Sequence, residues 1–192
     1  MKQVCVVGGI SSGKSYICKL FEKNDIPVFY FDIEAKKLYE DEKILRNVKE
    51  LFGISGDDII KKLAKIVFSD STKRRQLESL LKPDLMKAYY EACYKYEWIE
   101  NRPIFICECA TMMKSNDYKH FDEIILVHAD VDKREQMAIK RGMNINDFYS
   151  RVAAQMSTVE TLEILKKNNI KYVDFKNDFD DKSENFVLEY LK

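Results

Sequence analysis

The sequence predicts an α/β fold in which a five-stranded parallel sheet is flanked by helices. Two observations support this prediction. Short apolar runs, rich in Val and Ile, alternate along the chain with longer segments whose apolar residues recur at intervals of three and four. Two of these runs, over 104–109 and 123–128, are apolar enough to be typical of strands that helices cover on both faces. A chain of 192 residues suits one domain that carries an insertion.

The first two expected strands flank the first expected helix. Residues 2–7 form a β-branched run that ends in a Gly-Gly turn. Apolar residues at helical spacing follow over about 14–23. A second strand is expected over 28–31, and Asp32 closes it.

The next segment, residues 33–100, carries no strand signal. Its long charged stretches contain apolar residues at intervals of three and four, so we expect several helices there. Aromatic residues, Trp98 among them, are frequent at the end of this segment. Their helical spacing favours burial in a core or a domain contact over a platform for adenine.

Three further strands are expected in the second half of the chain, over 104–109, 123–128 and 171–175. The expected helices of this half cover 132–141, 145–156, 157–167 and 182–191. Ser157 and Glu160 have the spacing of a capping box, which marks the start of the third of these helices.

Composition excludes several classes of protein. A chain that is 46% apolar and 33% charged, with only 6 Gly and 3 Pro, is neither disordered nor collagen-like. Lys and Arg total 32, and Asp and Glu also total 32, so the net charge is zero. A neutral chain has no general attraction to nucleic acid or to an anionic membrane, and we expect neither as a partner. Any phosphate group must therefore be bound by a local arrangement.

Two further features concern the cellular compartment. The apolar run at the N-terminus is shorter than that of a signal peptide, and no run approaches the roughly 18 apolar residues that span a bilayer. We therefore expect a cytoplasmic protein. The chain has five cysteines and no C-x-x-C pair, so we expect reduced, buried thiols rather than disulfides or a zinc site. They are Cys5, Cys18, Cys93, Cys107 and Cys109.

A phosphate-binding motif follows the first strand. Residues 8–15, Gly-Gly-Ile-Ser-Ser-Gly-Lys-Ser, match G-x-x-x-x-G-K-[ST], from Gly8 onward, between an expected strand and an expected helix. The backbone N–H groups of such a loop cradle a polyphosphate at the positive end of the helix. Lys14 is expected to reach the β- and γ-phosphates, and the Ser15 hydroxyl to bind Mg²⁺. The motif predicts ATP as co-substrate and Mg²⁺ as cofactor.

Two carboxylates lie at strand ends, where parallel sheets bind their ligands. Asp32 is suited to accept the proton of an acceptor hydroxyl, but Asp also favours helix N-caps, and the sequence leaves both roles open. Glu108 ends the third strand. It either holds Mg²⁺ through a water molecule or is an edge carboxylate without a role.

Cations recur in two segments. Arg134 and Arg141 are seven residues apart and so share one face of an expected helix, which is able to fold over the phosphates. Arg75 and Lys82 lie in the helical segment and would suit an acceptor that is rich in phosphate. Each of these side chains is alternatively an ordinary solvated cation.

Several segments together resemble dephospho-coenzyme A kinase. They are GGISSGKS at 8–15, IPVFYFDIEAKKL at 26–38, LLKPDL at 80–85, PIFICECATMM at 103–113 and RVAAQMS at 151–157. The segments occur in that family's order over essentially the whole chain. The resemblance implies a P-loop kinase fold with a nucleotide-binding core at about 1–32, 102–135 and 168–192. It also implies a helical acceptor insertion at about 33–101 and a lid at about 136–167.

The same resemblance implies an activity and site residues. The activity is transfer of the ATP γ-phosphate to the ribose 3′-hydroxyl of dephospho-CoA, the final step of coenzyme A biosynthesis. By position, Asp32 is the catalytic base, Arg141 the lid arginine, and Asn177 part of an adenine-contacting loop. The residues placed around the ATP phosphates are Ser11, Ser12, Gly13, Lys14, Ser15 and Tyr16.

The chain departs from the family pattern at several positions. Ser11 replaces a Gly, Tyr30 an Asp, Lys82 a His, Glu108 an Asp, Ala110 a Pro and Met137 a lid Arg. Arg134, one turn before Met137, is a candidate for the missing lid cation.

The departures at Tyr30, Lys82 and Ala110 concern the acceptor side, so two alternative functions stay open. One is a nucleoside or deoxynucleoside monophosphate kinase of the same fold, and the other is a non-catalytic P-loop nucleotide-binding protein.

Overall fold

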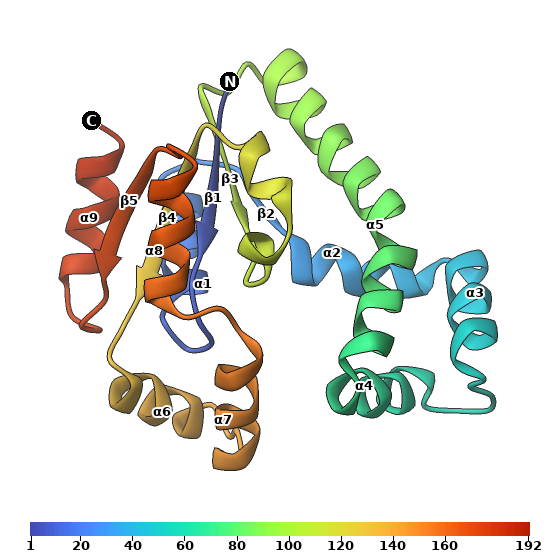
Figure 1. Cartoon of the computed structure of the whole chain (residues 1–192). Coiled ribbons are helices and arrows are strands. Elements are labelled where there is room, and N and C mark those ends of the chain that lie inside the picture. Colours follow the sequence, from blue (N-terminus) through green and yellow to red (C-terminus); the bar gives the residue numbers. More distant parts are fainter. The chain divides into compact units, whose positions relative to one another are not determined.

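A computed structural model describes the backbone of residues 1–192 and every side chain except that of Phe68. Five parallel strands form one sheet in the order β2-β3-β1-β4-β5 (Figure 1). The strands are β1 (Lys2–Val7), β2 (Val28–Tyr30), β3 (Ile104–Glu108), β4 (Glu123–His128) and β5 (Tyr172–Lys176). The predicted α/β fold with a five-stranded parallel sheet is confirmed.

Helices connect the strands, as parallel pairing requires. They are α1 (Lys14–Lys23), α2 (Phe31–Lys37), α3 (Glu42–Phe52), α4 (Ile59–Ser69), α5 (Ser71–Tyr94), α6 (Val131–Lys140), α7 (Ile145–Ala154), α8 (Thr158–Lys167) and α9 (Lys182–Tyr190). Most expected boundaries lie within one residue of these. The capping box at α8 is confirmed, because Ser157 and Glu160 exchange both hydrogen bonds.

One boundary changes the place of a site residue. Strand β2 ends at Tyr30, and α2 already begins at Phe31. Asp32 therefore lies in the first turn of α2 instead of closing the strand. Its proposed role as the N-cap of that helix is wrong for the same reason, although a carboxylate in the first turn still suits the helix dipole.

The chain divides into two compact units, each with its own core. The first, Met1–Tyr30 and Tyr96–Lys192, contains the whole sheet. Apolar side chains of α1 and α9 pack with those of the strands, and Phe186 of α9 stacks on Phe175 of β5 with ring centroids 4.3 Å apart. All five cysteines are free and buried. The residues of the expected lid, 136–167, also belong to this unit.

The second unit, Phe31–Lys95, consists of helices α2–α5 and the single turn Leu38–Glu40. Its core joins Ile44 and Val48 of α3, Leu63 of α4, and Leu77 and Leu81 of α5. No helix in the described part of the chain is both long and apolar enough to cross a membrane.

The expected burial of the aromatic segment is wrong for three of its side chains. Tyr89 is buried and stacks on Phe31, but Tyr90, Tyr94 and Trp98 are 56%, 62% and 73% exposed. Tyr90, Tyr94 and Trp98 are four residues apart and so follow one helical stripe, whereas Tyr89 lies on another face. Spacing alone does not show which of these faces is turned to the core.

Candidate active site

The phosphate-binding loop, residues 8–15, joins β1 to α1 at the carboxyl end of the central strand. Gly13 has a φ of 98°, and a β-carbon added there would lie 2.0 Å from Nδ2 of Asn177, so only glycine fits. Ser11 has a φ of 57°, in the left-handed region where the family usually has glycine. This conformation costs an L-residue roughly 1–2 kcal/mol. The loop therefore holds its shape against local backbone preference.

Asn177 supports this loop from the segment after β5. Its Nδ2 donates to the Ser12 carbonyl at 3.0 Å, and its Oδ1 accepts from the Phe179 backbone N–H at 2.8 Å. The side chain is 1% exposed. The family resemblance implies that Asn177 belongs to an adenine-contacting loop, and in this structure its amide holds the phosphate loop.

Gln155 supports the loop from the other side. Its Oε1 accepts the backbone N–H of Ile10 at 2.6 Å. Sequence reasoning missed this residue, although it lies in RVAAQMS, one of the segments that carries the family resemblance. Only its place in this segment marked Gln155 in the sequence, because no local pattern links positions 10 and 155.

Lys14 and Ser15 meet Glu108 at the carboxyl ends of two adjacent strands. The Ser15 hydroxyl lies 3.2 Å from each carboxylate oxygen of Glu108. The Lys14 ammonium donates to the Gly9 carbonyl at 3.2 Å and lies 4.0 Å from Oε1 of Glu108. Because β1 pairs with β3, the sheet brings together residues that are 93 positions apart in the chain.

This pair of oxygen donors fits Mg²⁺. Mg²⁺ prefers hard oxygen ligands, and it usually takes one or two protein groups, substrate phosphates and several waters. Ser15 and Glu108 supply a hydroxyl and a carboxylate at one point of the loop. Within the described residues, no group of three or more His, Cys, Asp and Glu side chains forms an all-protein metal cage.

The two arginines of α6 have different surroundings. The Nε–H of Arg134 donates to the Ile10 carbonyl of the phosphate loop at 2.8 Å. Arg141 is the exposed C-cap residue of the same helix. Met137, at which the resemblance implies a missing lid arginine, lies between them in the sequence and is half-buried.

Tyr30, one of the departures assigned to the acceptor side, is engaged elsewhere. Its hydroxyl donates to Oε2 of Glu22 on α1 at 3.0 Å. Burial, together with this hydrogen bond, raises the pKa of Tyr30 well above its ordinary value. The residue therefore stays a neutral donor to α1. Asp32 follows two residues later and is exposed in the second unit.

The expected acceptor cations lie on the long helix α5. Arg75 and Lys82 are both exposed, and they are two turns apart. Arg75 borders an open hollow of about 450 Å³, which is also lined by Leu51, Thr72, Gln76, Ser79 and Leu80. Lys82 precedes Pro83, which begins a second open hollow of about 560 Å³.

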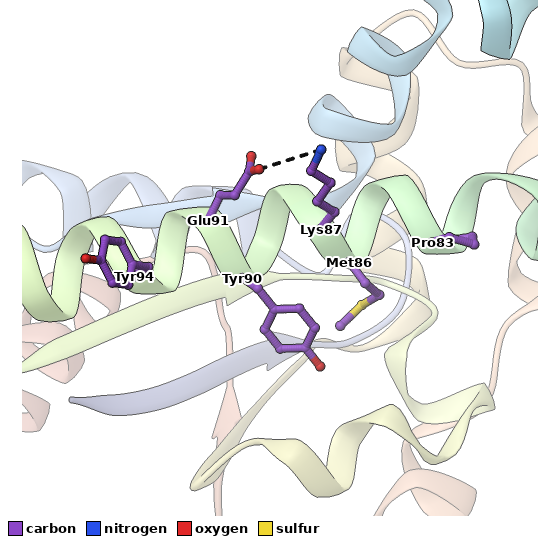
Figure 2. Close-up of a pocket in the computed structure, with 6 residues that line it drawn as sticks. All are labelled: Pro83, Met86, Lys87, Tyr90, Glu91 and Tyr94. Carbon is purple, nitrogen blue, oxygen red and sulfur yellow. Dashed lines mark ion pairs between the residues drawn. The ribbon is translucent and has the colours of Figure 1, made fainter.

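Figure 2 shows that second hollow along the exposed face of α5. Met86, Tyr90 and Tyr94 project from successive turns, and Lys87 forms an ion pair with Glu91 at 3.9 Å. The face therefore combines exposed aromatic rings with charged groups. Such a surface is able to contact both a ring and a polar chain.

Comparison with known proteins identifies the family. The sequence profile described as Dephospho-CoA kinase matches residues 2–170. A dephospho-CoA kinase of Chlorobaculum tepidum is 31% identical over 170 residues, which are 83% of this chain and 81% of that protein. One of Aquifex aeolicus is 29% identical over 181 residues, which are 91% of this chain and 87% of that protein.

Solved structures support the fold. A protein of Thermus thermophilus has a TM-score of 0.81 at 22% identity, and the match covers 100% of this chain and 98% of that chain. The dephospho-CoA kinase of Campylobacter jejuni has a TM-score of 0.63 at 16% identity, with 100% and 96% covered. A shikimate kinase of Acinetobacter baumannii, solved with shikimate, has a TM-score of 0.53 at 10% identity, with 100% and 91% covered. The expected P-loop kinase fold is thus confirmed.

The sequence profile, the relatives and the loop geometry agree. This chain belongs to the dephospho-CoA kinase family, and it is a transferase that phosphorylates a hydroxyl acceptor.

Proposed function

We propose that this chain transfers the γ-phosphate of ATP to the 3′-hydroxyl of the ribose of dephospho-CoA. The observation that carries the proposal is the cluster of Lys14, Ser15 and Glu108 on the phosphate loop of a chain of this family. The cluster combines a cation for the β- and γ-phosphates with two oxygen donors for a hard metal ion.

The loop residues bind and orient the ATP phosphates. Residues 11–16 are proposed to surround the ATP phosphates at the start of α1, where a helix N-terminus favours anions, with Tyr16 exposed. Lys14 follows the charge of the γ-phosphate during transfer. Ser15 and Glu108 would hold Mg²⁺, which when bound neutralises the charge that develops on the β- and γ-phosphate oxygens.

Asp32 is proposed as the base. Its carboxylate accepts the proton of the 3′-hydroxyl as the oxygen forms its bond to the γ-phosphorus. The bond from that phosphorus to the β–γ bridging oxygen breaks, and ADP leaves. Chain continuity keeps Asp32 two residues beyond the end of β2, and its exposure leaves it accessible. A positioned base contributes about 10²- to 10⁴-fold in rate.

Three further cations, Arg75, Lys82 and Arg141, are proposed to bind phosphate groups of the substrates. Arg75 and Lys82 are proposed to contact the phosphates of the acceptor, because both are exposed on the same side of α5. Arg141 is proposed as a lid cation, since its exposed position at the end of α6 leaves its five donors available. Closing such a segment excludes water, so that ATP is not hydrolysed.

The proposal is tested by coupled ADP release with purified protein, Mg²⁺ and ATP. Dephospho-CoA is compared with a panel of nucleoside and deoxynucleoside monophosphates and with a mixture that lacks any acceptor. We expect ADP release that depends on dephospho-CoA. Turnover with a monophosphate but not with dephospho-CoA would show another acceptor, and ATP binding without any turnover would show a non-catalytic protein.

A further inference from the structure

Arg134 lies directly against the phosphate loop. Its Nε–H donates to the Ile10 carbonyl at 2.8 Å, and its guanidinium crosses Gly9. A β-carbon added to Gly9 would lie 2.5 Å from Nη2 and 2.8 Å from Cζ of the arginine. Any larger residue at position 9 would displace the guanidinium, so this glycine makes room for Arg134.

The ring of Phe148 also lies near the guanidinium of Arg134. Phe148 of α7 is fully buried, and its ring centroid lies 5.9 Å from Cζ of Arg134. A guanidinium near an aromatic ring is attracted to it, and the ring restricts its motion. The loop carbonyl and the ring together hold the side chain in one place.

The guanidinium of Arg134 has no counter-charge among the described side chains. Among the residues that the structure describes, no carboxylate pairs with Arg134, and its only hydrogen bond uses Nε. Burial lowers the pKa of the guanidinium, which nonetheless stays charged at neutral pH. A partly buried charge without a partner is unfavourable unless an anion joins it. The two amino groups, Nη1 and Nη2, are therefore available to an anionic ligand.

The neighbouring lysine indicates which anion this is. Lys14 donates to the Gly9 carbonyl and Arg134 to the next carbonyl along the loop, that of Ile10. The P-loop lysine contacts the β- and γ-phosphates. Arg134 thus lies at the same end of the nucleotide, and its planar fork suits a phosphate.

We propose that Arg134 contacts the γ-phosphate of ATP and supplies the lid cation that Met137 lacks. The two positions are three residues apart on α6, so they share one face of the helix. The proposal rests on the use of ATP by this chain, and it assigns a phosphate-binding residue within the proposed site.

Binding without an acceptor tests the proposal separately from the reaction. Affinities for a non-hydrolysable ATP analogue and for ADP, both with Mg²⁺, are measured by calorimetry for the wild type and for Arg134→Gln. We expect the variant to bind the ATP analogue about tenfold to a hundredfold more weakly, and ADP within about threefold of the wild type. The control is Lys167→Gln, which removes one exposed positive charge from α8 and is expected to change neither affinity.

Two further variants separate phosphate contact from support of the loop. In Arg134→Gln/Met137→Arg, the returned charge is expected to recover most of the lost affinity, and Arg134→Lys is expected to retain part of it. The unliganded Tm of Arg134→Gln is expected to equal or exceed that of the wild type, because an unpaired charge has been removed.

Three results would overturn the proposal. They are unchanged affinity for the ATP analogue in Arg134→Gln, equal losses for the analogue and for ADP, or a lower unliganded Tm with no recovery by either charged variant. Failure of the wild type to phosphorylate dephospho-CoA would contradict the proposed function instead, and it would leave these binding measurements intact.

Discussion

The phosphate loop of the first unit and helix α5 of the second unit hold their polar groups in different ways. In the loop, Ile10, Ser12 and Ser15 are bound by side chains that lie 93 to 165 positions away in the sequence. Along α5, Arg75 and Tyr90 are exposed beside open hollows. The phosphate loop is thus held in place by the protein itself, whereas the proposed acceptor contacts are exposed side chains. Substitutions should have large effects at the first site and graded effects at the second.

The largest effect is expected from Lys14→Ala. Its ammonium is 7% exposed and anchored to Gly9, so its loss removes a fixed charge from the phosphate end. We expect kcat to fall by at least about 10³-fold. The measurement is dephospho-CoA-dependent ADP release, with Lys19→Ala on the exposed side of α1 as control. Activity within tenfold of the wild type would contradict the role of the loop.

Asp32→Asn extends the comparison to the second unit. The amide keeps the size of the side chain and loses its basicity, so kcat should fall about 10²- to 10⁴-fold. Affinity for ATP should stay unchanged, because the phosphate loop and the side chains of Gln155 and Asn177 that hold it belong to the first unit. Steady-state kinetics and calorimetry are compared with Asp57→Asn, an exposed loop position of the same unit. A fully active variant would remove Asp32 from the reaction.

Glu108→Gln tests the proposed metal ligand. The amide can still accept the Ser15 hydroxyl but has lost its charge, so the Mg²⁺ concentration that gives half-maximal activity should rise about tenfold. A magnesium titration of ADP release measures this shift, with Glu163→Gln on the exposed side of α8 as control. An unchanged titration curve would contradict the assignment of Glu108 as a ligand of Mg²⁺.

These contacts also show what the sequence was able to predict. Strands β1–β4 were located because they are largely apolar runs, and Glu108 was placed near the loop because parallel strands end at one edge. Arg134 and Gln155 bond to Ile10 from 124 and 145 residues away, and no local pattern encodes those hydrogen bonds. The residues of the candidate site were therefore predictable where they belong to one motif or lie at one edge of the sheet.

The remaining errors came from helix faces and helix ends. Tyr90 and Trp98 follow a helical stripe that is exposed, while Tyr89, on another face, is buried. Asp32 lies in α2 because β2 ends at Tyr30, one residue earlier than expected, and the helix begins at Phe31. A pattern of residue types does not show which helix face is buried or at which residue a strand ends.

The smallest effects are expected from Arg75→Ala and Lys82→Ala. Each removes one exposed cation from α5, so each should raise the KM for dephospho-CoA about two- to fivefold and leave the KM for ATP unchanged. Lys65→Ala on α4 is the control, since it removes an exposed lysine of the same unit. A matching rise in the KM for ATP would contradict the separation between the two sides.

The most direct test of the whole account is the position of the transferred phosphate. Dephospho-CoA is incubated with the protein, Mg²⁺ and ATP, and the product is analysed by mass spectrometry and ³¹P NMR beside a 3′-deoxy analogue of the acceptor. The account predicts one added phosphate, a new monoester signal from the 3′ position, and no product from the analogue. Phosphorylation of the analogue, or a phosphate at another position, would contradict it.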